Sequence, residues 1–419
     1  MKKILFMMTV VLLGTVLCLL PACSNESNDP VLEVPEPVNL EDMDDGPALD
    51  NALKLSKLQL NRLSSVNSFS LGMLSELDHS SEGKSIVFSP LGVIYALGMG
   101  AETAKEPAQK ELANVLGFPG RLSLHRFCRK FIEGIPAVDD AVELAVANGA
   151  FVNSAFGQKL PESWCSVWKE NYDATYQEAD FSDPKTLTEI NAWCNERTSG
   201  KISSPLSVLK PSALLYLVNA LYFKADWLAP FRTSATHDGS FVREDGTGTT
   251  VPLMYQEARF PYFENEIFQI CSFPYANDKF SMHVVLPRKG RSLNEVLGLL
   301  TAESLSEALS SQDNKEKTEV LLPRFSTCCD GSLVATLQKL GIRRIFQSGE
   351  LTGGLELEDC FQSTVINVNE KGTEAASVTY NEYGTYGLSR IFAATRPFFY
   401  FISEKSTGAI LFMGTYHGD

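Results

Sequence analysis

Hydrophobic and polar positions recur with two different periods along the chain, and this difference predicts its elements. Over residues 48–80, leucine and valine recur at roughly helical spacing. Residues 143–153 and 214–223 are apolar almost throughout, as expected for strands buried on both faces of a sheet. Helical patterns dominate the first half and strand patterns the second, which is typical of an α+β protein. We therefore expect one mixed domain over 48–419, without an internal repeat or a linker-like break.

Local signals predict where several elements begin and end. Ser89 is a good N-cap, and Pro90 follows at the first helical position, where its missing N–H has no cost. Thr103 and Glu106 have capping-box spacing, which predicts a helix that ends at Gly117. Further helices are predicted over 161–172, 188–202, 293–310 and 330–342. Further strands are predicted over 267–274, 279–287, 317–325, 397–403 and 409–416, and Asp245-Gly246 marks a turn.

The first 22 residues read as an export signal. Lys2 and Lys3 precede an apolar run over residues 4–20, which is typical of a secretory signal peptide. The run ends Leu20-Pro21-Ala22-Cys23, which resembles the bacterial lipobox and implies cleavage before Cys23 and its acylation. Acyl chains would then hold an exported lipoprotein on a membrane, facing either the periplasm or the cell surface. An ordinary signal peptide or a single membrane anchor are the alternatives.

Residues 23–47 have the composition of a tether. They hold eight acidic residues, no lysine or arginine, and several prolines, so they are better solvated than packed. The net charge of −15 becomes −17 without the signal, and the tether carries −8 of it. No basic stripe is visible in the rest of the chain, so nucleic acid is not expected as a partner.

The search for catalytic or metal-binding patterns gives no positive residue. The chain contains no GxSxG, HExxH, phosphate-binding glycine loop or GxGxxG, and its five histidines are not paired at metal spacing. A catalytic pair of carboxylates remains possible, because residues distant in sequence can come together in the folded structure. Seven cysteines lie outside the signal and the lipobox, and they show no CxxC spacing. A single disulfide remains possible, but the spacing does not indicate a disulfide framework. We expect neither an enzyme, a metal nor a cofactor.

The segment NEKGTEAASVTYNEYGTYGLSR, residues 369–390, is longer than most loops in compact domains and follows a good strand. Alternate residues from Thr373 onward are small and uncharged, whereas Glu374 and Glu382 fall on the opposite face. Such a face suits a strand that enters a packed interior, where overpacking costs about 1–3 kcal/mol per site. The small face consists of Thr373, Ala375, Ser377 and Thr379. The alternative is an exposed loop that never inserts.

Eight segments of the chain form a recognisable series. In order, they are SIVFSPLGVIYALGMGAETAKEPAQKELANVLGF, NAWCNERTSGKI, LVNALYFKADWLAPF, DGTGTTVPLM, VLLPRFS, LQKLGI, VNEKGTEAASVT and ATRPFFYFISEKSTGAILFMG. Each of them is similar to a motif of the serpin family. The resemblance covers 48–419. It implies helices packed around a large, mostly antiparallel central sheet with smaller sheets, and an exposed reactive-centre loop over about 373–394. It also implies a metastable protease inhibitor, whose cleaved loop inserts as a new strand and drags the acylated protease with it.

The resemblance implies roles for particular residues. The hinge would comprise Glu370, Gly372, Thr373, Ala375, Ala376, Ser377 and Thr379. Loop spacing places the reactive bond at Tyr386–Gly387, with Thr385 or Tyr383 as the alternatives if the register slips. An aromatic residue there suggests a chymotrypsin-like serine protease as partner, whereas Thr385 would suit an elastase-like enzyme. A papain-like cysteine protease is the other alternative, and a non-inhibitory serpin is the rival reading.

A sheet-opening cluster is implied at Ser89, Asn219, Gln362 and Trp227. Here the chain departs from the family pattern, because Gln362 stands where a histidine is usual and Gly92 where serine is frequent. This departure puts the pH response and the opening energy of the cluster in doubt. We expect a monomer.

Overall fold

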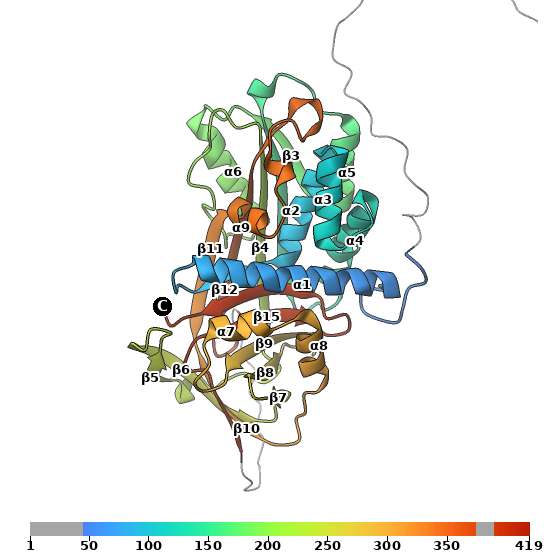
Figure 1. The fold of residues 1–419 in the computed structure, drawn as a ribbon. Coiled ribbons are helices and arrows are strands. Elements are labelled where there is room, and N and C mark those ends of the chain that lie inside the picture. Colours follow the sequence, from blue (N-terminus) through green and yellow to red (C-terminus); the bar gives the residue numbers. More distant parts are fainter. Residues whose placement is uncertain (1–44, 374–388) are drawn as a thin grey trace, which may run out of the picture.

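The structure is a computed structural model that describes residues 45–373 and 389–419 (Figure 1). The predicted signal peptide, Cys23 and most of the predicted tether lie outside these residues, as do the loop residues 374–388 with Tyr386 and Gly387. In the described part, one end is rich in helices and the other in strands, and the long helix α1 (Lys57–Ser80) crosses between them (Figure 1).

Eight further α-helices lie in the described part. They are α2 (Pro90–Thr103), α3 (Glu106–Leu116), α4 (Arg121–Gly134), α5 (Glu162–Tyr172), α6 (Pro184–Arg197), α7 (Leu293–Leu299), α8 (Ala302–Ser310) and α9 (Val334–Lys339). Helices α2 to α6 belong to the helical end, whereas α7 and α8 cover the strand-rich end (Figure 1).

The strands form three sheets in the described part. The central sheet has the order β11-β12-β13-β4-β2-β3, from β11 (Phe325–Ser332), β12 (Leu357–Val368), β13 (Gly372–Thr373), β4 (Leu215–Asp226), β2 (Glu143–Asn153) and β3 (Ala174–Ala179). The second sheet runs β1 (Ile86–Phe88), β16 (Ile410–Tyr416), β15 (Phe398–Glu404), β9 (Phe280–Pro287), β8 (Phe268–Pro274) and β7 (Tyr262–Glu264). The third runs β14 (Arg390–Ala393), β10 (Thr318–Pro323), β6 (Gly248–Ala258) and β5 (His237–Val242).

Strand β4 is buried on both faces, as its continuous apolar sequence predicts. Alternate residues point to opposite sides of the sheet. Leu215, Leu217 and Leu221 join the main core, whereas Tyr216 and Val218 join a smaller core that includes residues of α6. The central sheet therefore has helices on both of its faces along β4.

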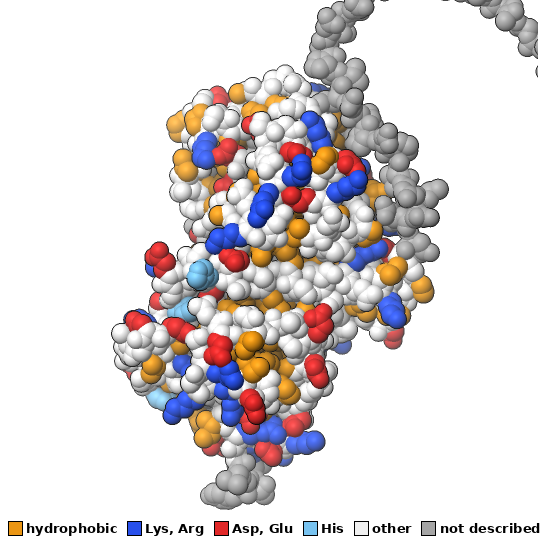
Figure 2. Space-filling model, in the orientation of Figure 1, with side chains coloured by type: hydrophobic (Ala, Val, Ile, Leu, Met, Phe, Trp, Pro, Cys, Tyr) orange, Lys and Arg blue, Asp and Glu red, His pale blue; other side chains and the backbone are white. Residues whose placement is uncertain are grey.

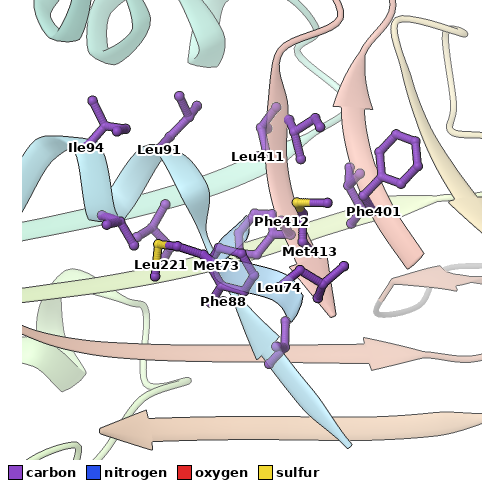
Figure 3. Close-up of a cluster of buried hydrophobic side chains, with 14 of the residues drawn as sticks. Met73, Leu74, Phe88, Leu91, Ile94, Leu221, Phe401, Leu411, Phe412 and Met413 are labelled. Atoms are coloured by element: carbon purple, nitrogen blue, oxygen red, sulfur yellow. The ribbon is translucent and has the colours of Figure 1, made fainter. Parts of the chain in front are cut away.

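Helix α2 lies in the centre of the molecule, and all fourteen of its residues are buried. A helix that is apolar all round needs such a position. Figure 3 shows Leu91 and Ile94 of this helix, Met73 of α1, Leu221 of β4 and side chains of β16 as members of one buried cluster. This core joins the helical end to the central sheet.

Several expected boundaries are confirmed, and others are wrong. Ser89 caps α2 through a bond from the Gly92 amide (3.2 Å), and α3 ends at Gly117 with φ +73°. The capping box from Thr103 is wrong, because Thr103 ends α2 and its hydroxyl donates to the Gly100 carbonyl. The helix predicted over 293–310 is two helices, and residues 330–332 belong to strand β11.

Acidic and basic side chains are interspersed on the face shown in Figure 2, without a single basic stripe. No helix among the described residues is long and apolar enough to cross a membrane. The seven cysteines of this part are free, and it contains no cluster of three or more His, Cys, Asp or Glu side chains that could hold a metal ion.

Candidate functional site: the hinge and the seam of the central sheet

The candidate site is a seam between two parallel strands of the central sheet. Strands β12 and β4 are directly paired from Leu357–Leu215 as far as Val365–Tyr222. Beyond that point the short strand β13 lies between them, antiparallel to both. Thr373 is opposite Val368 on one side and Ala225 on the other. The seam is therefore closed along most of its length, and two residues of the hinge occupy its mouth.

Gly372 enters this mouth because it lacks a side chain. A Cβ atom at this position would lie 2.2 Å from the Ala225 carbonyl oxygen and 2.6 Å from the Asp226 Cα. Both contacts are with backbone, which cannot move aside as a flexible side chain could. The glycine of the predicted hinge is thus required by the close approach of β13 to β4.

Two stacked aromatic side chains hold the hinge: Tyr275, which follows β8 of the second sheet, and Trp227, which follows β4 of the central sheet. The Thr373 hydroxyl is 2.8 Å from the hydroxyl of Tyr275, and both residues are fully buried. The Tyr275 ring stacks on Trp227, with centroids 4.5 Å apart and planes 14° apart. Trp227 in turn donates its indole N–H to the Asn369 carbonyl (2.9 Å) and its backbone N–H to Lys371 (2.8 Å).

Glu370 is buried beside these residues, with 6% of its surface exposed. One carboxylate oxygen accepts from the Thr236 hydroxyl (2.7 Å) and lies 3.3 Å from Arg324. Its carbonyl accepts from the Phe231 amide (2.7 Å). A buried carboxylate needs such partners. The root of the loop is thus fixed by charge, hydrogen bonds and packing together.

A second polar cluster closes the seam further along. The Gln362 carboxamide of β12 accepts from the Ser89 amide (2.8 Å) and donates both to the Ser89 carbonyl (3.0 Å) and to Asn219 of β4 (2.9 Å). Asn219 donates to Asn148 of β2 (2.7 Å), which donates to the Tyr172 carbonyl of α5 (2.7 Å). This network joins three strands to two helices. The side chains of Ser89, Gln362, Asn219 and Asn148 do not titrate.

Gly92 makes room for the Gln362 side chain. A Cβ atom at this position would lie 2.0 Å from the Asn219 Oδ1 and 2.6 Å from the Gln362 Nε2. The two departures from the family pattern noted in the sequence therefore touch each other. The Gln362 carboxamide fits at this place because Gly92 has no side chain.

The other end of the loop is anchored in the third sheet. Arg390, at the start of β14, pairs with Asp313 (2.9 Å) and Glu316 (3.0 Å), and its guanidinium lies 5.2 Å from the centre of the Tyr262 ring. The carboxylates raise the pKa of Arg390 above its already high value. Phe392 is fully buried. The chain thus leaves the central sheet at Thr373 and reappears in a different sheet at Arg390.

Both ends of the exposed loop predicted over 373–394 belong to strands. Thr373 is buried in β13 and residues 390–393 form β14. Ser89, Asn219 and Gln362 are brought together, but Trp227 packs with the hinge, eight residues further along the chain than Asn219. Ala375, Ala376, Ser377 and Thr379 lie outside the described residues.

Sequence reasoning missed Tyr275, Phe231, Thr236 and Arg324. These residues approach the hinge only in space. Phe231 and Arg324 stand in two of the serpin-like segments, but neither segment indicated a contact with the hinge. The sequence pointed to residues 370–373 but not to the residues that contact them in the fold.

Comparison with known proteins agrees with this geometry. The model of the family described as Serpin (serine protease inhibitor) matches residues 64–417. The chain belongs to the serpin family. An uncharacterized serpin-like protein of Thermococcus kodakarensis is 33% identical over 371 residues, covering 84% of each chain. Human neuroserpin is 32% identical over 370 residues, covering 82% of this chain and 88% of the relative.

Solved serpin structures share the fold. The thermophilic serpin tengpin in its native state has a TM-score of 0.77 at 23% identity, over 85% of this chain and 93% of that one. Protease nexin-1, solved with heparin, has a TM-score of 0.78 at 25% identity, over 86% of this chain and 100% of that one. The predicted serpin fold, with helices around a large and mostly antiparallel sheet, is confirmed.

Proposed function

We propose that this serpin is a lipid-anchored suicide inhibitor of endopeptidases. A protease attacks the Tyr386–Gly387 bond, its serine hydroxyl forms an ester with the Tyr386 carbonyl, and Gly387 leaves as the new amine. Before water hydrolyses the ester, the loop enters the seam between β12 and β4 and carries the protease with it. Fourteen residues from Thr373 to Tyr386 span roughly 45 Å at about 3.3 Å per residue.

The position of Thr373 is the observation that carries this proposal. It lies in the mouth of the seam, antiparallel to both neighbouring strands, in the orientation that a strand inserted from this end would need. The seam beyond it is closed by strand pairing and by the Gln362 network. Insertion replaces the single pairing of β12 with β4 by two pairings, one on each side of the new strand. It therefore adds backbone hydrogen bonds and buries the small face of the loop.

The register of β13 can be extended to the rest of the small face. In an inserted strand, Ala375 would be opposite Ile366 and Phe223, Ser377 opposite Thr364 and Leu221, and Thr379 opposite Gln362 and Asn219. Thr379 would therefore arrive where the Gln362–Asn219 hydrogen bond must break. Its hydroxyl can both donate and accept, so it can replace that bond on both sides.

The tyrosine at the reactive bond favours a chymotrypsin-like serine protease with a deep apolar pocket. Cleavage at a neighbouring residue would instead suit an elastase-like or papain-like enzyme. A non-inhibitory serpin would be cleaved without insertion, but the small, uncharged hinge face gives no reason for such a failure. Incubation with each protease class, followed by mass measurement of the released fragment, identifies the bond.

The acylated Cys23 would tether the body to a membrane. Asp45, at the start of the described chain, accepts from Gln59 (3.0 Å) and pairs with Arg62, both on α1. The tether would thus join the body beside α1, away from β13 and β14. The variant Cys23→Ala should move the protein from the membrane fraction to the soluble fraction. Protease digestion of intact cells then separates a surface location from a periplasmic one.

One gel tests the inhibitory mechanism. Mixed with chymotrypsin, the protein should give a covalent band that survives SDS. Thr373→Arg should abolish this band while cleavage continues, because a charge cannot enter the buried position that Thr373 occupies. Thr188→Arg, on an exposed position of α6, is the matched control and should keep the band. Normal inhibition by Thr373→Arg would contradict the insertion mechanism.

A further inference from the structure

Tyr275 lies where the second sheet meets the hinge. It directly follows β8, its amide donates to the Phe280 carbonyl (2.9 Å), and it forms an isolated bridge with Trp227. Its ring stacks on Trp227 and makes an edge-to-face contact with Phe223, with ring centroids 5.2 Å apart and planes at 63°. Because the ring is fixed on two sides, the position of its hydroxyl is fixed as well.

That hydroxyl points at one residue of the hinge. Among the described residues, its hydrogen-bond partner is the Thr373 hydroxyl at 2.8 Å. Neither residue is more than 1% exposed, so water does not replace the bond if it breaks. Burial raises the pKa of Tyr275, which keeps the phenol protonated and neutral. Withdrawal of Thr373 from the sheet would therefore leave a buried hydroxyl without a partner.

The neighbours of Thr373 in the sequence cannot take its place. A shift of one residue would bring either Gly372, which has no side chain, or Glu374, which is charged, opposite Tyr275. A one-residue slip also moves every side chain of a strand to the other face of the sheet. The hydroxyl pair therefore selects the register in which the small face of the loop points inward.

We propose that Tyr275 is a positioning residue for loop insertion. It fixes Thr373 as the first residue of the inserted strand and thereby sets the register of the residues that follow. This inference rests on the proposed function, since it concerns the first step of the same insertion. It assigns a role in that step to a residue outside the loop and outside the central sheet.

A mutant cycle tests the hydroxyl pair. The proteins are the wild type, Tyr275→Phe, Thr373→Val and the double variant. Tyr275→Phe leaves the Thr373 hydroxyl buried without a partner, so Thr373 should withdraw and the amides of 369–373 should exchange hydrogen faster. The double variant removes both hydroxyls and should restore protection, because replacing both partners by apolar groups of similar shape is nearly neutral.

Insertion itself is followed without any trapped protease. The loop is nicked, and the rate at which each protein gains heat stability is measured. Tyr275→Phe should insert about tenfold more slowly, the effect expected of one lost buried hydrogen bond, and the double variant should recover most of the rate. Tyr216→Phe removes a buried hydroxyl that accepts from Lys210 at the opposite end of β4, and it should insert at the wild-type rate.

The outcomes separate the two proposals. If the wild type inserts and all variants match it in hydrogen exchange and in rate, the role of Tyr275 is refuted while the proposed function stands. If Tyr275→Phe and the double variant are equally slow, the ring and not the hydroxyl pair matters, which also refutes the inference. If the nicked wild type gains no stability, the proposed function fails and the inference falls with it.

Discussion

The side chains of Gln362 and Asn219 are joined by a 2.9 Å hydrogen bond across the seam between β12 and β4. This bond lies in the path of the strand that the proposed mechanism inserts. Gln362 also holds both backbone groups of Ser89, at the N-terminus of the most buried helix. The cluster therefore stabilises the closed sheet and must rearrange when the sheet opens.

Replacement of Gln362 by leucine should weaken the closed seam. Three hydrogen bonds are lost, and the Ser89 amide and the Asn219 carbonyl oxygen are left buried without that partner. We expect unfolding in urea to require about 2–4 kcal/mol less free energy, and the uncleaved protein to lose inhibitory activity faster on storage. Gln338→Leu, at an exposed position of α9, is the control. Equal stability of the two variants would contradict the assigned role of the network.

Two glycine-to-alanine variants should change the stability of the protein in different directions. Gly92→Ala places a methyl group against Asn219 and Gln362 and should destabilise the protein by about 1–3 kcal/mol. Gly298→Ala, in α7, meets no atom within 4 Å and should be neutral or stabilising by up to about 1 kcal/mol. Thermal unfolding of both variants checks this. A harmless Gly92→Ala would show that the cluster has spare room.

Glu102 predicts a pH dependence of stability. Burial raises its pKa to about 7, although Arg121 lies 2.8 Å away, and burial lowers the pKa of the adjacent His125 to about 3. Between pH 4.5 and 7 the unfolded chain loses the Glu102 proton first, so this residue lowers stability as pH rises. His125 acts oppositely between about pH 3 and 6.5, because there the unfolded chain binds the extra proton.

The variant Glu102→Gln isolates the first effect. Its unfolding free energy relative to wild type should rise by about 3 kcal/mol from pH 4.5 to 7 and stay constant above that range. The pKa of about 7 already includes the attraction of Arg121, which forms an ion pair with Glu102 only once Glu102 is ionised. Urea titrations at four pH values measure the difference. A difference that is flat with pH would show that Glu102 titrates normally.

Arg390 should slow the insertion of the loop into the central sheet while the loop is still uncleaved. An uncleaved loop can fill the seam only if β14 leaves β10, and the contacts of Arg390 with Asp313, Glu316 and Tyr262 oppose this step. Arg390→Ala should shorten the active lifetime of the uncleaved protein about five- to tenfold, as expected for a loss of about 1 kcal/mol. Arg129→Ala removes an exposed ion pair on α4 and should leave the lifetime unchanged. The same lifetime in both variants would refute the anchor.

Patterns local in sequence predicted much of this fold. The apolar run over 214–223 predicted a strand buried on both faces, and Ser89-Pro90 predicted the start of α2. The pattern of 293–310 hid a break, because Leu300 leaves the helix and Thr301 caps a new one. Contacts between distant segments, such as Tyr275 with Thr373, have no local signal. Even the buried state of Thr373 follows only from the gap that β4 and β12 leave.

The most direct test compares the melting temperature of the intact protein with that of the protein nicked once within residues 374–388. The account predicts that the nicked protein melts at a clearly higher temperature, because the freed segment becomes a strand of the central sheet. An unchanged or lower melting temperature would mean that the sheet does not accept the loop, and the inhibitory mechanism would be wrong.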